Sequence, residues 1–146
     1  MSLKYTKDLN KEAPRSPKVN VGGFLILGRT IDKCRGTIDG KAGEYHFDCP
    51  LDNQIFGWKG IKGEDFKVFV AADHTDAEIA DWVKTNGTSK TAEEIEAWNK
   101  KVSSNNYSDD PEKKTWLEGE NKRLGLDKDA TLFDYLDADD KASYTK

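Results

Sequence analysis

Residues 24–38, with the sequence FLILGRTIDKCRGTI, decide the fold of this chain. Apolar side chains recur at steps of three and four residues, the spacing that one face of an α-helix requires, at Phe24, Leu27, Ile31, Cys34 and Ile38. Charged side chains fall largely off this stripe, and glycines follow at positions 40 and 43. The stretch therefore predicts an amphipathic helix that buries one face in a core.

The rest of the chain shows further helical periodicity with recognisable start signals. Thr75 with Glu78, and Thr91 with Glu94, form two capping boxes, in which a hydroxyl and a carboxylate satisfy free N–H groups at a helix start. Pro50 and Pro111 suit the first turn of two other helices. Additional helices are expected at about residues 50–58, 64–72, 75–86, 91–102, 110–124 and 131–136.

Three segments fall outside this pattern. Pro14 and Pro17 disfavour helical geometry in the residues before them, so residues 1–20 are predicted to form an extended lead-in. Residues 44–49 alternate apolar and polar side chains, which predicts a short extended bridge, and the charged residues 137–146 are expected to fray. The predicted fold is an all-α, compact orthogonal array of six or seven short helices, without substantial sheet, in a single domain over residues 1–146.

Composition narrows the class of protein. The charged fraction of 34% is high, but an aromatic fraction of 10% supplies a core, which argues against disorder. No apolar run is long enough to span a membrane and no signal peptide is evident, so we expect a cytoplasmic location and no membrane partner. The net charge of −4 disfavours nucleic-acid binding, although residues 1–41 hold nine Lys and Arg against four Asp and Glu.

Three strings within residues 6–52 resemble a bacterial family known only as a domain of unknown function. They are TKDLNKEAPRSP at 6–17, VGGFLILGRTIDKCRG at 21–36 and GEYHFDCPLD at 43–52. The resemblance extends over residues 6–140. It implies a one-domain protein and no particular activity, substrate or cofactor.

Polar residues between positions 15 and 48 are the candidates for function. Arginine pairs can clamp a carboxylate or phosphate through two hydrogen bonds, and the predicted helix leads directly to a histidine and an aspartate. The competing interpretation is a solvated basic face paired with nearby acids. We predict a small binding module that holds a small anionic ligand or an acidic partner group, in a pocket formed by Arg15, Arg29, Asp32, Arg35, His46 and Asp48.

Two other functions stay open. Cys49, at a predicted helix start with His46 nearby, could serve a thiol- or metal-dependent enzyme. The alternation places Cys49 with Tyr45 and Phe47, however, which favours burial, and the ligand spacing of a zinc site is absent. No metal or other cofactor is therefore predicted. The last alternative is an interaction domain without a pocket, which exposed tryptophans would favour and buried ones would oppose.

Overall fold

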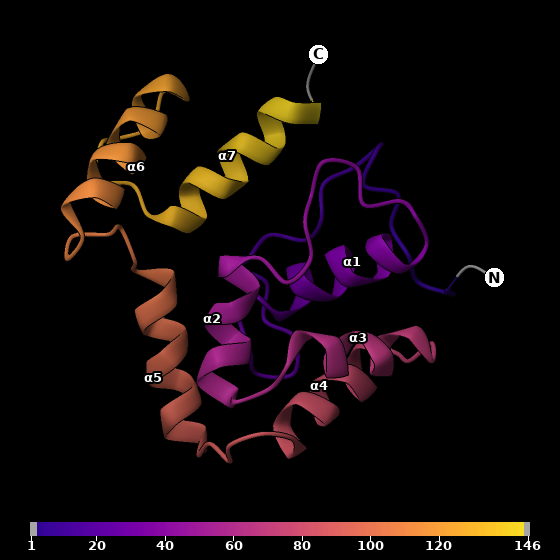
Figure 1. The fold of residues 1–146 in the computed structure, drawn as a ribbon. Coiled ribbons are helices and arrows are strands. Elements are labelled where there is room, and N and C mark those ends of the chain that lie inside the picture. Colours follow the sequence, from indigo (N-terminus) through magenta and orange to yellow (C-terminus); the bar gives the residue numbers. More distant parts are fainter. Residues whose placement is uncertain (1–2, 145–146) are drawn as a thin grey trace.

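Seven helices form the part of the chain that the computed structural model describes, residues 3–144, which confirms the predicted all-α class (Figure 1). The only β-pairing in these residues is an isolated bridge between Val21 and Phe24. The helices are α1 (Leu27–Ile38), α2 (Pro50–Lys59), α3 (Gly63–Ala71), α4 (Asp76–Thr85), α5 (Ala92–Ser103), α6 (Pro111–Arg123) and α7 (Leu132–Tyr144).

Helix α1 lies at the centre of the array and packs against α2, α3 and α4. Ten of its twelve residues, Leu27 through Gly36, are buried. In Figure 1, α3 and α4 lie together at the bottom, α5 runs along the left side, and α6 and α7 form a pair at the upper left. Because α1 is covered from several directions, its polar residues are buried together with its apolar ones.

The core consists of two hydrophobic clusters. The main one gathers buried side chains of the segment before α1, of α1 to α5 and of Phe133 from α7. The smaller one holds Leu117, Leu132 and Tyr135 between α6 and α7, and Leu51 of α2 packs against both clusters. The α6–α7 pair thus has a small core of its own and joins the main body through few apolar side chains.

Helix α1 begins three residues later than its periodicity predicts. Val21 and Phe24 exchange backbone hydrogen bonds of 3.0 and 3.1 Å, which closes a turn where the first helical residues were expected. Ile26 has a φ of 71°, outside the helical region, and its N–H donates to the carbonyl of Pro17 at 2.9 Å. Phe24 is nevertheless fully buried. The prediction of a buried apolar stripe was therefore correct for Phe24, and the predicted helix start was wrong.

Two other segments differ from their predictions. Residues 44–49 form turns instead of an extended bridge, with Asp48 at a φ of 64°. The alternation of burial is still present, because Tyr45, Phe47 and Cys49 are half-buried between exposed neighbours. The predicted fraying from residue 137 is wrong as far as the chain is described, since α7 continues to Tyr144, whose hydroxyl donates to the carbonyl of Leu9 at 2.6 Å.

The N-terminal segment, residues 3–20, contains no helix and lies against α1. Leu9, Pro14 and Pro17 are buried, and the N–H of Leu9 donates to the carbonyl of Lys41 at 2.9 Å, just beyond the helix. This segment closes one side of α1 and brings Arg15 into contact with it.

Candidate functional site

The central helix carries four charged residues into the interior. Arg29, Asp32, Lys33 and Arg35 are each at most 3% exposed. Burying a charge is unfavourable unless a partner compensates it, so each needs an opposite charge. Arg29 and Lys33 are four residues apart on one face, and Asp32 and Arg35 are three apart on another. The helix therefore divides its charges between two networks.

One face forms the closed network, made of Arg15, Asp32, Arg35 and Asp76. Arg15 donates to Asp32 Oδ2 from its backbone N at 2.8 Å and from Nε at 3.1 Å, and its Nη1 reaches Asp76 Oδ2 at 2.7 Å. Arg35 Nη1 donates to the other oxygen of Asp76 at 3.0 Å. Burial opposes the charge of Asp76, but hydrogen bonds from Arg15 and the charge of Arg35 outweigh it and lower the pKa of Asp76. Hydrogen bonds and ion pairs within this network engage all four residues. None of the four lines either of the two cavities, of about 850 and 470 Å³.

The other face forms the cavity-facing network, made of Arg29, Lys33, Asp52 and Asp140. Arg29 holds Asp140 of α7 through both terminal nitrogens, at 2.7 and 3.2 Å, and Lys33 Nζ lies 3.1 Å from Asp52 Oδ2 of α2. Tyr45 donates its hydroxyl to Asp140 Oδ1 at 2.7 Å. Burial disfavours the charge of Arg29, but the bonds to Asp140 more than compensate and raise its pKa.

Asp52 organises the start of α2. Its carboxylate is fully buried and accepts hydrogen bonds from Thr30 Oγ1 at 2.7 Å and from the backbone N of Asp48 at 2.9 Å and of Cys49 at 3.3 Å. Asp52 is the third residue of the helix, and its backbone N–H in turn donates to the Cys49 side chain, which makes a capping box. The same carboxylate therefore positions Lys33 and the first turn of α2.

A cavity of about 850 Å³ opens beside this network and is called the larger cavity below. Its wall comes from α1, the start of α2, the turns at residues 43–46, Tyr107 and the inner side of α7. Basic groups and tyrosines in the wall are Arg29, Lys33, Lys113, Tyr45, Tyr107 and Tyr144. Carboxylates in the wall are those of Glu44, Asp139 and Asp140. This size suits a small organic molecule.

The six residues predicted as one site do not meet in one place. Arg29 and His46 line the larger cavity, whereas Arg15, Asp32 and Arg35 belong to the closed network. Asp48 is exposed and accepts a hydrogen bond from Asn53 Nδ2 at 2.9 Å; its carboxylate packs so close to Gly63 that a side chain there would overlap it. Only two of the six are thus positioned to contact the same ligand.

The two cysteines lie in different environments. Cys34 is fully buried on α1, and burial raises the pKa of its thiol to about 12. Cys49 is half-buried, lines the larger cavity, and accepts a hydrogen bond from Lys33 Nζ at 3.0 Å. Both thiols are free. Cys49 is therefore the thiol that a molecule in the cavity could reach.

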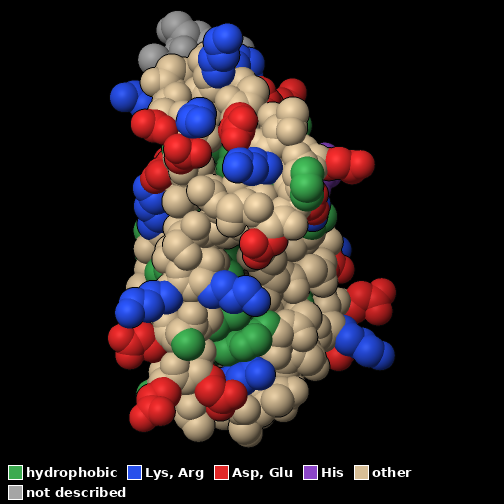
Figure 2. All heavy atoms as spheres, turned by 90° about the vertical axis from the view of Figure 1, so that its left-hand side faces the viewer, with side chains coloured by type: hydrophobic (Ala, Val, Ile, Leu, Met, Phe, Trp, Pro, Cys, Tyr) green, Lys and Arg blue, Asp and Glu red, His purple; other side chains and the backbone are tan. Residues whose placement is uncertain are grey.

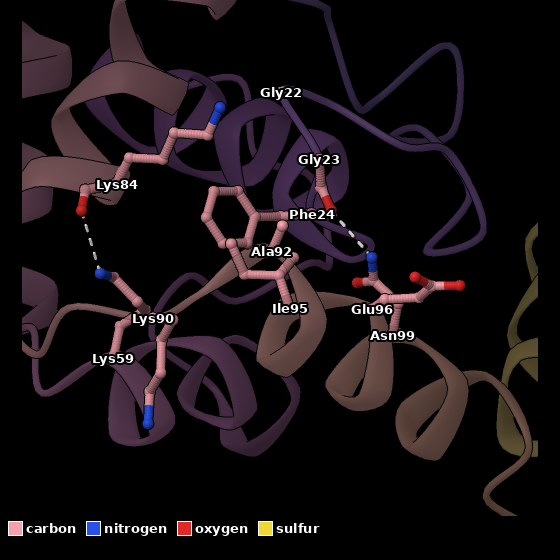
Figure 3. A pocket seen from close by; sticks show the side chains of 10 residues that line it. All are labelled: Gly22, Gly23, Phe24, Lys59, Lys84, Lys90, Ala92, Ile95, Glu96 and Asn99. Atoms are coloured by element: carbon pink, nitrogen blue, oxygen red, sulfur yellow. Dashed lines mark hydrogen bonds between the residues drawn. The ribbon is translucent and has the colours of Figure 1, made fainter.

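A smaller cavity of about 470 Å³ lies at the C-terminal end of α2, away from the start of that helix, which lines the larger cavity (Figure 3). The turn at Gly22–Phe24 and the first turns of α5 form much of its wall. Figure 3 shows three lysines at one end, Glu96 and Asn99 at the other, and Phe24, Ala92 and Ile95 between them. The lysines are Lys59, Lys84 and Lys90. The sequence analysis did not predict this cavity, because the residues that line it come from four separate segments of the chain.

The tryptophans are neither all buried nor gathered on the surface. Trp98 is buried and stacks on the half-buried Trp58 with ring centroids 4.7 Å apart, while Trp82 packs on Phe69. Trp116 on α6 is 47% exposed. Figure 2 shows the side of the molecule where α5 and α6 lie, with acidic and basic side chains interspersed and hydrophobic ones gathered only in its lower half. This surface offers limited apolar area for docking a partner.

Sequence reasoning missed the acidic partners and the tyrosines. Asp52, Asp76 and Asp140 each hold a buried basic group, and Tyr45 sits over Arg29, with the guanidinium carbon 5.5 Å from the ring centroid. The position of Asp52, three residues after the N-cap residue Cys49, is a local signal that could have predicted its role in the capping box of α2. For Asp140 no local signal existed, because Arg29 lies 111 residues earlier in the chain.

No three His, Cys, Asp or Glu side chains of residues 3–144 are grouped as a metal ion would require. None of the helices there combines the length and apolar character needed to cross a bilayer.

The fold and its buried charges define the class of protein as an all-α domain built on a charged central helix with cavities on two sides. The chain belongs to the family described as a domain of unknown function (DUF5069), which matches residues 11–142. No curated protein matches the sequence.

Proposed function

We propose that this protein is a small binding module that holds a ligand with an acidic group in the larger cavity. The observation that carries the proposal is the convergence of Arg29, Lys33 and the first turn of α2 on one cavity of about 850 Å³. The proposal keeps the class of function that the sequence indicated and moves the site to residues that face a common space.

The electrostatics of the cavity favour an anion at its inner end. Cys49, Pro50 and Leu51 line it, so the N-terminal end of α2, which carries partial positive charge, faces the space. Lys33 Nζ also lies at this end of the cavity, where it donates a hydrogen bond to Cys49 Sγ. Of the three carboxylates in the wall, Asp140 is already paired with Arg29. Those of Glu44 and Asp139, on the turn before Tyr45 and on α7, would direct an acidic group away from themselves.

The remaining wall suits an organic body more than a bare inorganic ion. Tyr45, Tyr107 and Tyr144 provide aromatic surface with hydroxyl groups, and Leu132 and Leu136 add apolar area from α7. Small-molecule sites combine mostly apolar walls with a few polar groups that fix orientation. A small organic carboxylate or phosphate ester is therefore the class of ligand that fits.

A thermal-shift and calorimetric screen of organic carboxylates and phosphate esters tests the proposal. Gln54 lines the cavity, and its side chain makes no hydrogen bond within residues 3–144, so Gln54→Trp fills the space with little harm to the fold. A ligand at about 100 times its Kd stabilises the wild type by roughly 2.7 kcal/mol, and this shift should vanish in Gln54→Trp. Lys122→Gln, an exposed change on α6 outside the cavity, is the matched control. If no compound stabilises the wild type more than Gln54→Trp, the proposal fails.

A second candidate function is thiol chemistry at Cys49, and one contact favours it. The ammonium of Lys33 lies 3.0 Å from Cys49 Sγ, which lines the larger cavity, so a cation stands beside the nucleophilic atom of an accessible thiol. Iodoacetamide should then modify one thiol per folded chain, at Cys49, and Lys33→Met should slow that reaction. Cys49→Ser, which retains only the buried Cys34, should remain unmodified until unfolded. Equal slow labelling of both wild-type cysteines would remove this candidate.

A further inference from the structure

Lys59 is a buried cation without an acidic partner. It is 1% exposed, and its ammonium donates to the carbonyls of Lys84 at 3.2 Å and Thr88 at 2.7 Å. No carboxylate of residues 3–144 lies within ion-pair distance of it. An ammonium has three N–H bonds, so one remains without an acceptor in this part of the chain.

The other buried basic residues are each compensated by a carboxylate. Arg29 has Asp140, Lys33 has Asp52 and Arg35 has Asp76. Lys59 has only backbone carbonyls as partners, one at the C-terminal end of α4 and one in the loop after it. A carbonyl oxygen carries only partial negative charge, so the full positive charge of the ammonium is not balanced. Burial, together with the nearby Lys90, lowers the pKa of Lys59. A negative group brought to this position would remove the imbalance.

The smaller cavity, which Lys59 lines, has a division of polar groups that suits such a group. Lys59, Lys84 and Lys90 are at one end, and the one carboxylate of its wall, Glu96, is at the other (Figure 3). Lys84 and Lys90 extend from the wall in opposite directions, and the ammonium of Lys90 lies 5.1 Å from the centroid of the Trp58 ring. The cavity is therefore locally cationic in a protein whose net charge is −4.

The middle of the cavity is apolar and rigidly built. Phe24 is fully buried and lies beside Ala92 and Ile95 of α5. Asn99 fixes the adjacent turn, because its Nδ2 donates to the carbonyl of Gly23 at 2.8 Å and its Oδ1 accepts from the N–H of Leu25 at 3.1 Å. Gly23, at a φ of 102°, has open space where a side chain would project, so the turn leaves room for an occupant.

We propose that the smaller cavity is a second binding site, independent of the larger one, for a small anion carried on an apolar body. The acidic head group faces Lys59 and the rim lysines, and the apolar body lies on Ala92 and Ile95. Glu96 at the far end repels the head group and so fixes the orientation. A carboxylate and a phosphate monoester share this chemistry.

Phenyl phosphate and benzoate are suitable probes, with inorganic phosphate as the control lacking a body and benzyl alcohol as the control lacking a charge. Binding is measured by isothermal titration calorimetry on the full chain. The double variant Lys84→Gln/Lys90→Gln removes two rim charges without touching Lys59, and neither side chain holds another element by an ion pair in residues 3–144. We expect this double variant to bind at least one of the two charged probes, phenyl phosphate or benzoate, with about tenfold lower affinity than the wild type.

Gln54→Trp separates this site from the larger cavity. The proposal requires that a charged probe binds wild type and Gln54→Trp with equal affinity, and that both control compounds bind more weakly. It is overturned if neither charged probe binds at millimolar concentration, if the double lysine variant binds like Lys122→Gln, or if Gln54→Trp abolishes binding. The last outcome would place the probe in the larger cavity and would support the function proposed above.

Discussion

The closed network and the cavity-facing network contain the same chemistry in different settings. Each joins two basic residues to two carboxylates, and each uses buried residues of α1. In the closed network the partners are Arg15 of the N-terminal segment and Asp76 at the start of α4, and none of its four residues lines a cavity of about 850 or 470 Å³. In the cavity-facing network the partners come from α2 and α7, which diverge and leave about 850 Å³ between them.

The difference shows that position beside a cavity, and not residue type or burial, decides which buried charges can face a ligand. Arg35 and Arg29 are equally buried on the same helix, but Arg35 donates to Asp76 and to the carbonyl of His74, beside no cavity. Lys33 instead donates one hydrogen bond to a thiol that lines the cavity. In the function proposed above, the closed network is structural and the cavity-facing network is the ligand-binding side of α1.

Asp52→Ala should have the largest effect, because it breaks the cavity-facing network at its centre. The change leaves Lys33 buried and unpaired and removes acceptors from Thr30 and from the start of α2. Loss of one partner of a buried ion pair costs about 3–5 kcal/mol, to be measured by urea denaturation. Gln54→Ala changes a residue of the same helix whose side chain makes no hydrogen bond within residues 3–144, and it should change stability by no more than about 0.5 kcal/mol. A loss for Asp52→Ala as small as that of its control would contradict the assigned role.

Asp140→Asn should have an intermediate effect on the same network. The amide can still accept hydrogen bonds but no longer balances Arg29, so we expect a loss of about 2 kcal/mol. In the wild type, burial and the hydrogen-bonded Asp140 carboxylate raise the pKa of Tyr45. The variant should therefore ionise Tyr45 at lower pH, visible as tyrosinate absorbance. Tyr45→Phe identifies the signal, and an unchanged titration would show that α7 does not hold Asp140 against Tyr45.

Much of the fold followed from local signals, whereas the site did not. The two capping boxes at Thr75 and Thr91 are present with both reciprocal hydrogen bonds, and Pro50 and Pro111 begin helices as predicted. Such signals act within one helical turn, so spacing alone reveals them. The length of α7 escaped prediction because contacts with distant residues, among them Arg29, hold its charged second half.

The candidate site depended on contacts that no local pattern encodes. Arg29 and Arg35 are predicted neighbours on one helix, and the partners that separate them, Asp140 and Asp76, lie 111 and 41 residues away. Arg15 approaches α1 over Gly28, where a side chain would crowd its guanidinium, so even the closed network needs the tertiary fold. The stripe of Leu27, Ile31 and Cys34 could be recognised as core because apolar burial requires only periodicity.

The smallest expected effect concerns the closed network and depends on pH. Burial alone would raise the pKa of Asp76, but Arg15 and Arg35 bring it below the ordinary value of 3.8. The unfolded chain then binds the proton more readily, so the stability that Asp76 contributes is present above pH about 3.8 and is lost as the pH falls through the lower, folded pKa. The side chain is 40% exposed, which keeps the contribution modest.

Urea denaturation of the wild type and Asp76→Asn at pH values from about 6 down to about 2 measures this contribution. The difference in unfolding free energy should be constant near neutral pH and should shrink toward the acid end, because other carboxylates titrate alike in both proteins. Asp81→Asn, an exposed change on the same helix, is the matched control. A difference for Asp76→Asn that stayed constant over the whole range would mean that the closed network does not depend on the charge of Asp76. The contrast between the two faces of α1 would then rest on packing alone.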